Sequence, residues 1–139
     1  MKTLSIACFL LLLGSAFWSN GQAPHAQIPE EISLLQLIAT PERYDGKLVA
    51  VKGFLHLEFE GDILYLHRED WEQRISKNGI WVGGNPMLKE NSSTLDLHYV
   101  LVVGIFDSAR KGHMSSTSGS LTNIGRAFLW PPSISPLRR

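Results

Sequence analysis

Residues 47–59 carry alternating apolar and polar side chains, which is the period of a half-buried β-strand. One face of the segment holds Val49, Val51, Gly53, Leu55, Leu57 and Phe59, and the other holds Lys52, His56, Glu58 and Glu60. Gly53 indicates a bulge or a bend, as the corner of a small barrel requires. The Asp45-Gly46 dipeptide is a strong turn signal, so we expect the strand to begin directly after it.

A hairpin is predicted at the end of this strand. Glu60-Gly61 can close a two-residue turn into residues 62–67. In that register Leu57 faces Leu64, and both strands turn their leucines to the same side. The alternative three-residue loop would turn His67 toward the core, and we prefer the shorter turn for that reason.

Apolar residues recur at helical spacing before this strand. Ile32, Leu35 and Ile38 follow the acidic pair Glu30-Glu31, which predicts a short amphipathic helix with negative charge at its N-terminus. Thr40-Pro41-Glu42 then predicts one further turn, with a threonine N-cap and proline at the first helical position.

A second helix is predicted over residues 69–76, where Trp71 and Ile75 lie one turn apart and Asn78-Gly79 ends the run. The remaining segments follow in chain order: a brief strand at 80–82, a long polar loop through Asp96, an apolar strand at 98–106, a Gly/Ser/Thr loop at 108–118 and a last strand at 119–130.

These elements predict a β-rich α+β domain. Five strands with a bent first strand suit a partly open barrel of the oligonucleotide/oligosaccharide-binding (OB) type. One helix precedes the barrel, and another lies between its second and third strands. A five-stranded sheet with helices on one face is the competing arrangement.

The chain begins with the pattern of a secretory signal peptide over residues 1–21. Lys2 precedes the apolar run Leu4–Leu13, and small residues allow cleavage after Ala16 or after Gly21. The run is shorter than the about 20 residues that a bilayer span needs, so we expect no stable membrane span after cleavage. A permanent membrane anchor is the alternative. We then expect a flexible leader over 22–30, the OB-like domain over 31–130 and a disordered tail over 131–139.

Composition narrows the class of function. The chain is 44% hydrophobic and 19% charged, as an ordinary globular domain is. Its 13 basic and 13 acidic residues argue against nucleic acid as a partner, because that binding depends on cations that neutralise phosphates. The single cysteine, Cys8, lies in the predicted signal peptide, which leaves the mature chain without a thiol, a disulfide or a cysteine-based metal site.

Several turns and strand ends resemble a family of uncharacterised bacterial domains with a small OB-like barrel. The resemblance is carried by Tyr44-Asp45-Gly46-Lys47, residues 61–67, Ile80-Trp81-Val82, residues 103–107, Gly112-His113 and Ser118-Gly119. It implies a bacterial envelope setting, so that the protein would be periplasmic or secreted. It brings no catalytic residues with it, and a fold does not determine a function.

The hairpin supplies a candidate metal site. His56 would lie opposite Tyr65 and diagonal to His67, on the same outward face as Glu58. Two imidazoles and a carboxylate can hold a divalent ion such as zinc and leave a position open for water. The alternative is a polar outer face on which these side chains are simply solvated.

Aromatic side chains supply candidate ligand-binding residues. Tyr65, Trp71, Trp81 and Trp130 could form a stacking platform of the kind that OB barrels use. His113 lies in a Gly/Ser-rich loop that could contact the same ligand. Of these we select Tyr65, Trp81 and His113. The alternatives are that the tryptophans pack in the core and that the loop is only a connection.

Catalytic motifs are missing from the sequence. It has no HExxH, no GxSxG and no phosphate-binding glycine loop. We therefore predict a non-enzymatic exported binding module without a cofactor, whose partner is an envelope protein, a peptide or a glycan. The alternative is a metal-binding or metal-dependent envelope protein that uses His56, Glu58 and His67.

Overall fold

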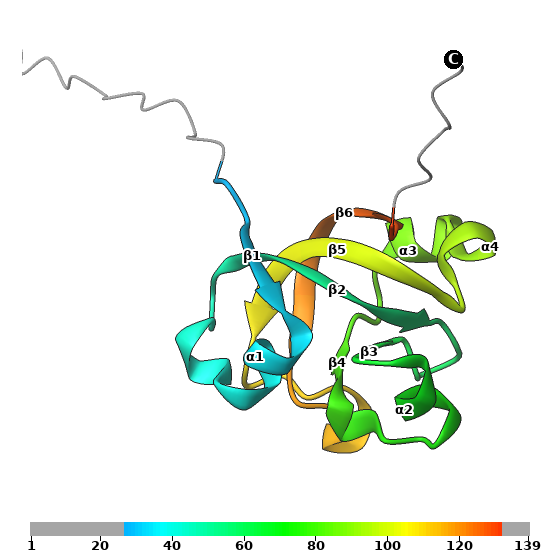
Figure 1. The fold of residues 1–139 in the computed structure, drawn as a ribbon, viewed down its shortest axis with the longest axis horizontal. Helices are drawn as coiled ribbons and strands as arrows, with labels where there is room; N and C mark the ends of the chain where they lie inside the picture. The colour runs from blue at the N-terminus through cyan, green and yellow to red at the C-terminus, as the bar shows by residue number, and fades with distance from the viewer. Residues whose placement is uncertain (1–26, 132–139) are drawn as a thin grey trace, which may run out of the picture.

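The computed structural model describes residues 27–131, shown in Figure 1. The predicted signal peptide, most of the predicted leader and most of the predicted tail lie outside these residues. The strands are β1 (Glu30–Ser33), β2 (Leu48–His56), β3 (Ile63–Tyr65), β4 (Gly79–Trp81), β5 (His98–Asp107) and β6 (Ser120–Leu129). The helices are α1 (Leu34–Ala39), α2 (Arg68–Glu72), α3 (Pro86–Glu90) and α4 (Ser92–Leu95), with 3-10 turns η1 (Pro41–Arg43), η2 (Ser76–Asn78) and η3 (His113–Ser115).

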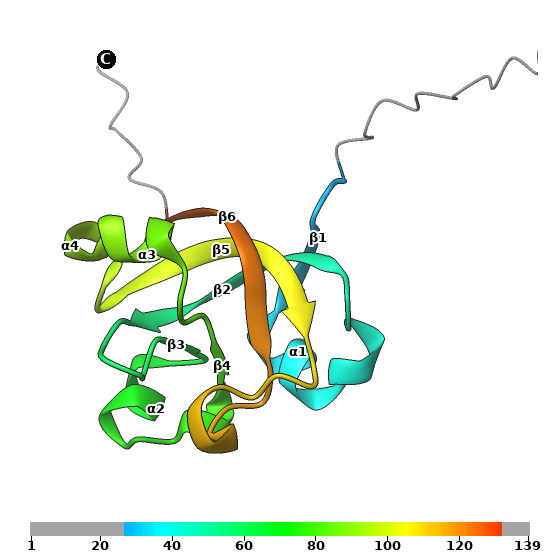
Figure 2. The same ribbon diagram turned by 180° about the vertical axis from the view of Figure 1, so that it is seen from behind.

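Five strands close into a barrel in the order β2-β3-β4-β6-β5, and β5 pairs back onto β2. The neighbours are antiparallel except β4 and β6, which are parallel and pair at Trp81 and Ser120. β1 adds a sixth strand parallel to β2. Figures 1 and 2 show the curled sheet from two opposite sides. The predicted OB-like barrel is confirmed, and β2–β5 pairing closes it.

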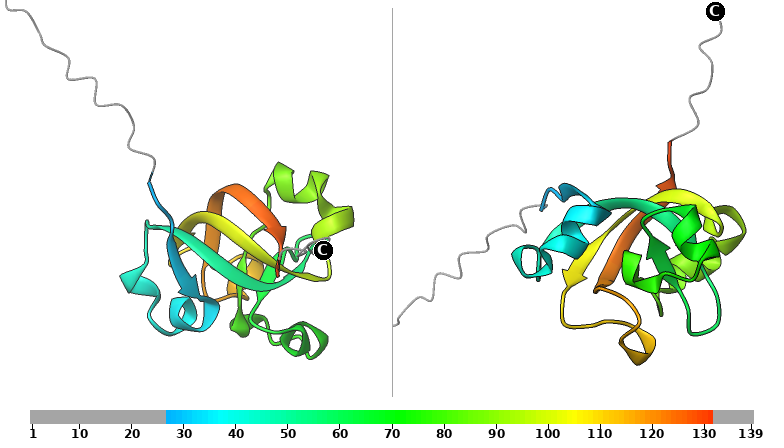
Figure 3. Two further views of the ribbon diagram at one scale, coloured as in Figure 1. Left: turned by 45° about the horizontal axis from the view of Figure 1, so that its top comes forward. Right: turned by 60° about the horizontal axis from the view of Figure 1, so that its bottom comes forward.

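The hydrophobic core fills the barrel and extends into the helices at its ends. Its buried strand residues include Val49, Val51, Leu55, Leu64, Ile80, Val100, Val102 and Phe106. Leu34 and Leu37 join the same core from α1, and Leu88 and Leu95 join it from α3 and α4. Figure 3 shows α1 and the α3–α4 pair on opposite sides of the barrel. The helices therefore cover apolar surface that the strands alone would leave open to water.

The start of the domain differs from the predicted amphipathic helix. Residues 30–33 are extended and pair with β2, where Ile32 lies opposite Val51. The helix begins only at Leu34, because Ser33 and Gln36 form a capping box. In that phase Leu35 points outward and is 60% exposed. The Ser-x-x-Gln spacing was the signal that placed the N-terminus of this helix.

The long polar loop predicted before Asp96 contains two short helices. Asn85 caps α3 by accepting a hydrogen bond from the Leu88 amide at 3.3 Å, and Pro86 stands at the first turn. Leu88 and Leu95 are buried. Two isolated leucines in a polar stretch leave no apolar run, so the pattern predicted a loop where two helix turns cover the core.

The predicted hairpin register is wrong by two residues. Leu55 pairs with Leu64, and His56 pairs with Ile63. The amides that would continue the ladder are engaged elsewhere, because Asp96 Oδ1 accepts the Leu57 N–H at 2.8 Å and Asp62 Oδ1 accepts the Glu58 N–H at 3.1 Å. Residues 57–62 consequently form a wider loop. A shift of two residues keeps the leucines on the core face.

Gly53 marks a close approach and no bulge. The pairing of β2 with β5 continues across it, from Leu48 opposite Ile105 to Leu55 opposite His98. A Cβ at Gly53 would lie 2.6 Å from the Tyr65 carbonyl oxygen of β3. Glycine is therefore required where β3 comes up against β2.

We expect Leu88→Ala to lower the free energy of unfolding by about 2–5 kcal/mol, since it removes a fully buried side chain from the core. Urea denaturation followed by circular dichroism measures this change. Leu35→Ala is the matched control, because its side chain lies on the outer face of α1, and it should cost less than about 1 kcal/mol. Equal losses for the two variants would contradict this assignment of the core.

Candidate functional site

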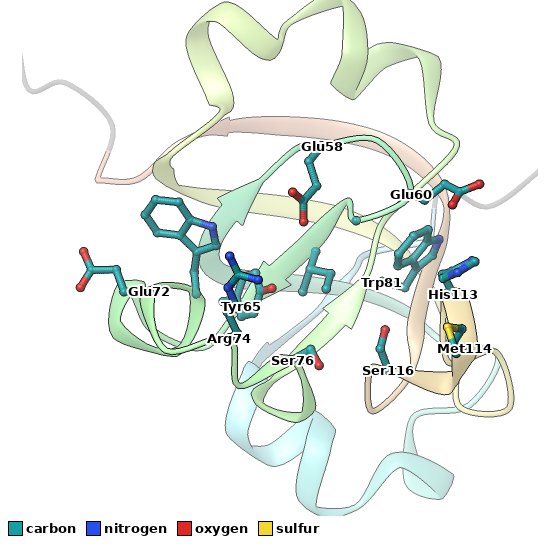
Figure 4. Close-up of a pocket in the computed structure, with 13 residues that line it drawn as sticks. Glu58, Glu60, Tyr65, Glu72, Arg74, Ser76, Trp81, His113, Met114 and Ser116 are labelled. Carbon is teal, nitrogen blue, oxygen red and sulfur yellow. The ribbon is translucent and has the colours of Figure 1, made fainter.

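A cleft of about 630 Å³ lies across the outer face of β3 and β4 (Figure 4). It is bounded by the loop between β2 and β3, by the segment from α2 to η2, and by the turn η3. The lining residues are Glu58, Glu60, Gly61, Ile63, Tyr65, Trp71, Glu72, Arg74, Ser76, Trp81, His113, Met114 and Ser116. Two adjacent strands and three connecting segments thus meet at one site.

The floor of the cleft is apolar. Phe54, Ile63 and Tyr65 are buried together on the outer face of the hairpin, and Trp71 and Trp81 pack against them. The rings of Phe54 and Trp71 lie 5.6 Å apart at 35°. This part of the outer face is therefore covered, because α2 folds over β2 and β3 here.

A buried carboxylate holds α2 and thereby Trp71 in place. Asp70 Oδ2 accepts the His67 N–H at 2.9 Å, and Asp70 Oδ1 accepts from Asn78 Nδ2 at 2.7 Å. These bonds tie the start of α2 to η2. The helix ends sooner than predicted, since Arg74 adopts φ of 57° and Ile75 is turned to solvent.

Trp81 forms a second aromatic wall, and two glycines lie close to its ring. A Cβ at Gly83 would lie 2.5 Å from Trp81 Cζ2, and a Cβ at Gly112 would lie 2.6 Å from Trp81 Cε3. Gly112 also has φ of 68°, which side-chain-bearing residues rarely adopt. A side chain at either position would clash with the indole.

Charged groups surround these aromatic surfaces. Glu58 extends into the middle of the cleft, while Glu60 and Glu72 lie toward its two sides (Figure 4). Arg74 lies beside Tyr65. Burial raises the pKa of the Tyr65 phenol, the negative charge of Glu58 raises it further, and Arg74 acts in the opposite direction. Three carboxylates and one guanidinium line the cleft, so its charge is predominantly negative.

Of the three predicted metal-binding residues, the structure brings His56 and Glu58 together but does not form the strand pairing that would add His67. His56 lies between two carboxylates, with Nε2 3.5 Å from Glu58 Oε2 and Nδ1 3.3 Å from Asp96 Oδ1. His67 caps α2 beyond the end of β3, and the predicted diagonal contact with His56 depended on a register that the hairpin does not adopt. Among residues 27–131 no group of three His, Cys, Asp or Glu side chains is arranged to hold a metal ion.

The predicted ligand-binding residues Tyr65, Trp81 and His113 all line the one cleft. That they bind a ligand stays a prediction. Trp130 lies elsewhere, with its ring 3.9 Å from Lys52 Nζ. Sequence reasoning missed Met114 as a lining residue. The loop of Met114 can be placed beside the third barrel strand only when the barrel topology is known.

Comparisons with protein-family models, with curated proteins and with solved structures found no match for this chain. The resemblance to exported bacterial domains stays a prediction. The strand order places the protein in the class of OB-like barrels. Its cleft lies over the second and third strands of the barrel. Within the part of the chain described, no helix has the length and apolar character of a membrane span.

We expect the free energy of unfolding to fall as pH rises above the ordinary tyrosine pKa of 10.0, because the folded chain holds the Tyr65 proton more strongly than the unfolded chain. Tyr65→Phe removes this contribution. Urea denaturation at about pH 9 and about pH 11 should show a smaller loss for Tyr65→Phe than for the natural chain.

Tyr99→Phe is the control for loss of a phenol outside the cleft. If Tyr65→Phe and the natural chain lose the same free energy of unfolding between the two pH values, the cleft does not raise the pKa of Tyr65.

Proposed function

We propose that the chain is an exported, non-catalytic binding module that receives its partner in the cleft over β3 and β4. One observation carries the proposal. OB barrels bind ligands on the face of their second and third strands, between the loop joining strands one and two and the loop joining strands four and five. Residues 57–62 and 108–119 are those loops here, and both supply walls of the cleft.

The surfaces of the cleft support retention of a ligand. Trp71 and Trp81 offer ring surfaces above a floor that contains the buried Tyr65. Aromatic groups contribute large contact areas for little lost side-chain freedom. Trp71 belongs to α2, Trp81 lies close to Gly83 and Gly112, and Tyr65 packs in the apolar floor. Binding energy at such a site is not consumed in ordering the protein.

The rim of the cleft supports a partner that is larger than the cleft itself. Met114, which lines the cleft, is 88% exposed, and Phe59, on the first loop between the lining residues Glu58 and Glu60, is 92% exposed. Burial of apolar surface is worth about 25 cal/mol per Å², so a partner that covers both tips is favoured over one confined to the floor. A peptide, a glycan or an envelope protein meets this condition.

Export rests on the pattern of residues 1–21, and we propose the periplasm or the medium as the location. When the full chain is produced in a Gram-negative host, we expect the exported protein to begin at Phe17 or at Gln22. N-terminal sequencing of the periplasmic fraction measures this. An uncut chain retained in the membrane fraction would instead support the anchor alternative.

The binding role is tested by replacing Met114 with the photo-reactive amino acid p-benzoylphenylalanine and irradiating the protein in an extract of its source cells. We expect a discrete adduct, because Met114 lines the cleft. The same amino acid at Leu35, which is exposed on α1, should yield no such adduct. Trp81→Ala in the Met114 variant should remove it. Equal adducts from both positions, or none from Met114, would reject the proposal.

A further inference from the structure

We propose that the cleft binds an extended peptide segment through a lysine or arginine side chain, which is placed between Trp81 and the carboxylates of the first loop. This inference rests on the proposed binding function and specifies the partner. It follows from three features: the charge of the walls, a similar arrangement of a lysine elsewhere in the chain, and a second cleft that Trp81 also lines.

The walls favour a cation. Glu58, Glu60 and Glu72 line the cleft against the single guanidinium of Arg74. Glu72 is also 3.3 Å from Arg68 Nε, which partly balances its charge. Glu58 and Glu60 belong to the loop on the Trp81 side, and Glu60 and Trp81 lie on the same side of the cleft in Figure 4. A cation in this part of the cleft would meet carboxylates and an aromatic ring together.

The chain already uses this combination once. Lys52 Nζ lies 3.9 Å from the centre of the Trp130 ring and 2.5 Å from Glu31 Oε1. A lysine is thus held between an indole face and a carboxylate, where both attract its charge. The cleft offers the same two partners in Trp81 and the Glu58–Glu60 loop. The cation would come from the ligand.

Trp81 belongs to more than one cleft, which favours an extended chain over a small cation. Trp81 also lines a second cleft of about 340 Å³ between the ends of β4 and β6. That cleft is lined by polar side chains, among them Asn85, Arg110 and Asn123. Two clefts that share one wall can hold successive residues of one extended segment, with its polar backbone beside the amides of the second.

The same charges disfavour a phosphate-bearing polymer. Proteins that bind single strands of nucleic acid line the groove with cations that follow the backbone. Here carboxylates occupy the loop between the first two barrel strands, where they would repel phosphates. A neutral saccharide would not use the carboxylates as ion-pair partners, so it enters the test as a competing outcome.

The test selects a displayed library of random 12-residue peptides on the immobilised domain. We expect enriched peptides to contain lysine or arginine. Synthetic copies should bind the natural chain with an affinity that falls as salt is added. Glu58→Gln combined with Glu60→Gln should weaken binding by about tenfold, as expected for two exposed ion pairs of up to about 1 kcal/mol each.

Glu42→Gln combined with Glu90→Gln is the matched control, because it makes the same change in net charge at exposed sites outside the cleft. It should leave the affinity unchanged. Equal losses for the two double variants would overturn the proposal, since general charge would then account for binding. Enriched peptides without basic residues would overturn it as well.

Chitohexaose and a decathymidine strand are tested in parallel by the quenching of tryptophan fluorescence. If either binds, loses affinity on Trp81→Ala and no basic peptide is enriched, the cleft is a binding site but its ligand class is wrong. If the Met114 adduct is absent and none of these probes binds, the binding function itself fails. The two failures are therefore distinguishable.

Discussion

Strand β2 pairs along both edges, and the rest of the structure depends on that arrangement. One edge pairs with β5 over the length of the strand, while the other is divided between β1 over Val49–Lys52 and β3 over Phe54–His56. Gly53 stands at the division, where β3 approaches too closely for a side chain. The β5 pairing closes the barrel, and the β3 pairing sets the floor of the cleft. A change at this point would disturb both.

Carboxylates at the ends of strands determine the loops around the cleft. Asp96 and Asp62 accept amides that would otherwise extend the hairpin, and Asp70 holds the turn of α2. Asp45 acts in the same way on the opposite side, where its Oδ1 accepts the Ser108 N–H at 2.8 Å and the bond lowers the pKa of its carboxyl. These side-chain carboxyl groups replace backbone partners, so loop shape here depends on side-chain acceptors as much as on turn type.

Sequence reasoning predicted the barrel because alternation at period two reports the face on which each strand residue lies. It could not predict the register, which depends on Asp96, a residue 39 positions from the amide that it binds. It missed α3 and α4 because two leucines carry no periodic signal. Tyr65, Trp81 and His113 were grouped as ligand candidates and do line one cleft, whereas His67 was assigned to a metal group through a register that does not form.

The two glycines beside Trp81 have a consequence for selectivity. Because a side chain at Gly83 or Gly112 would clash with the indole, glycine at these positions lets the backbone come close to the ring. A ring packed close to the backbone leaves less room for rearrangement on binding, so the fit of a ligand to this wall contributes to its affinity. Such a site discriminates by shape at the wall that Trp81 forms.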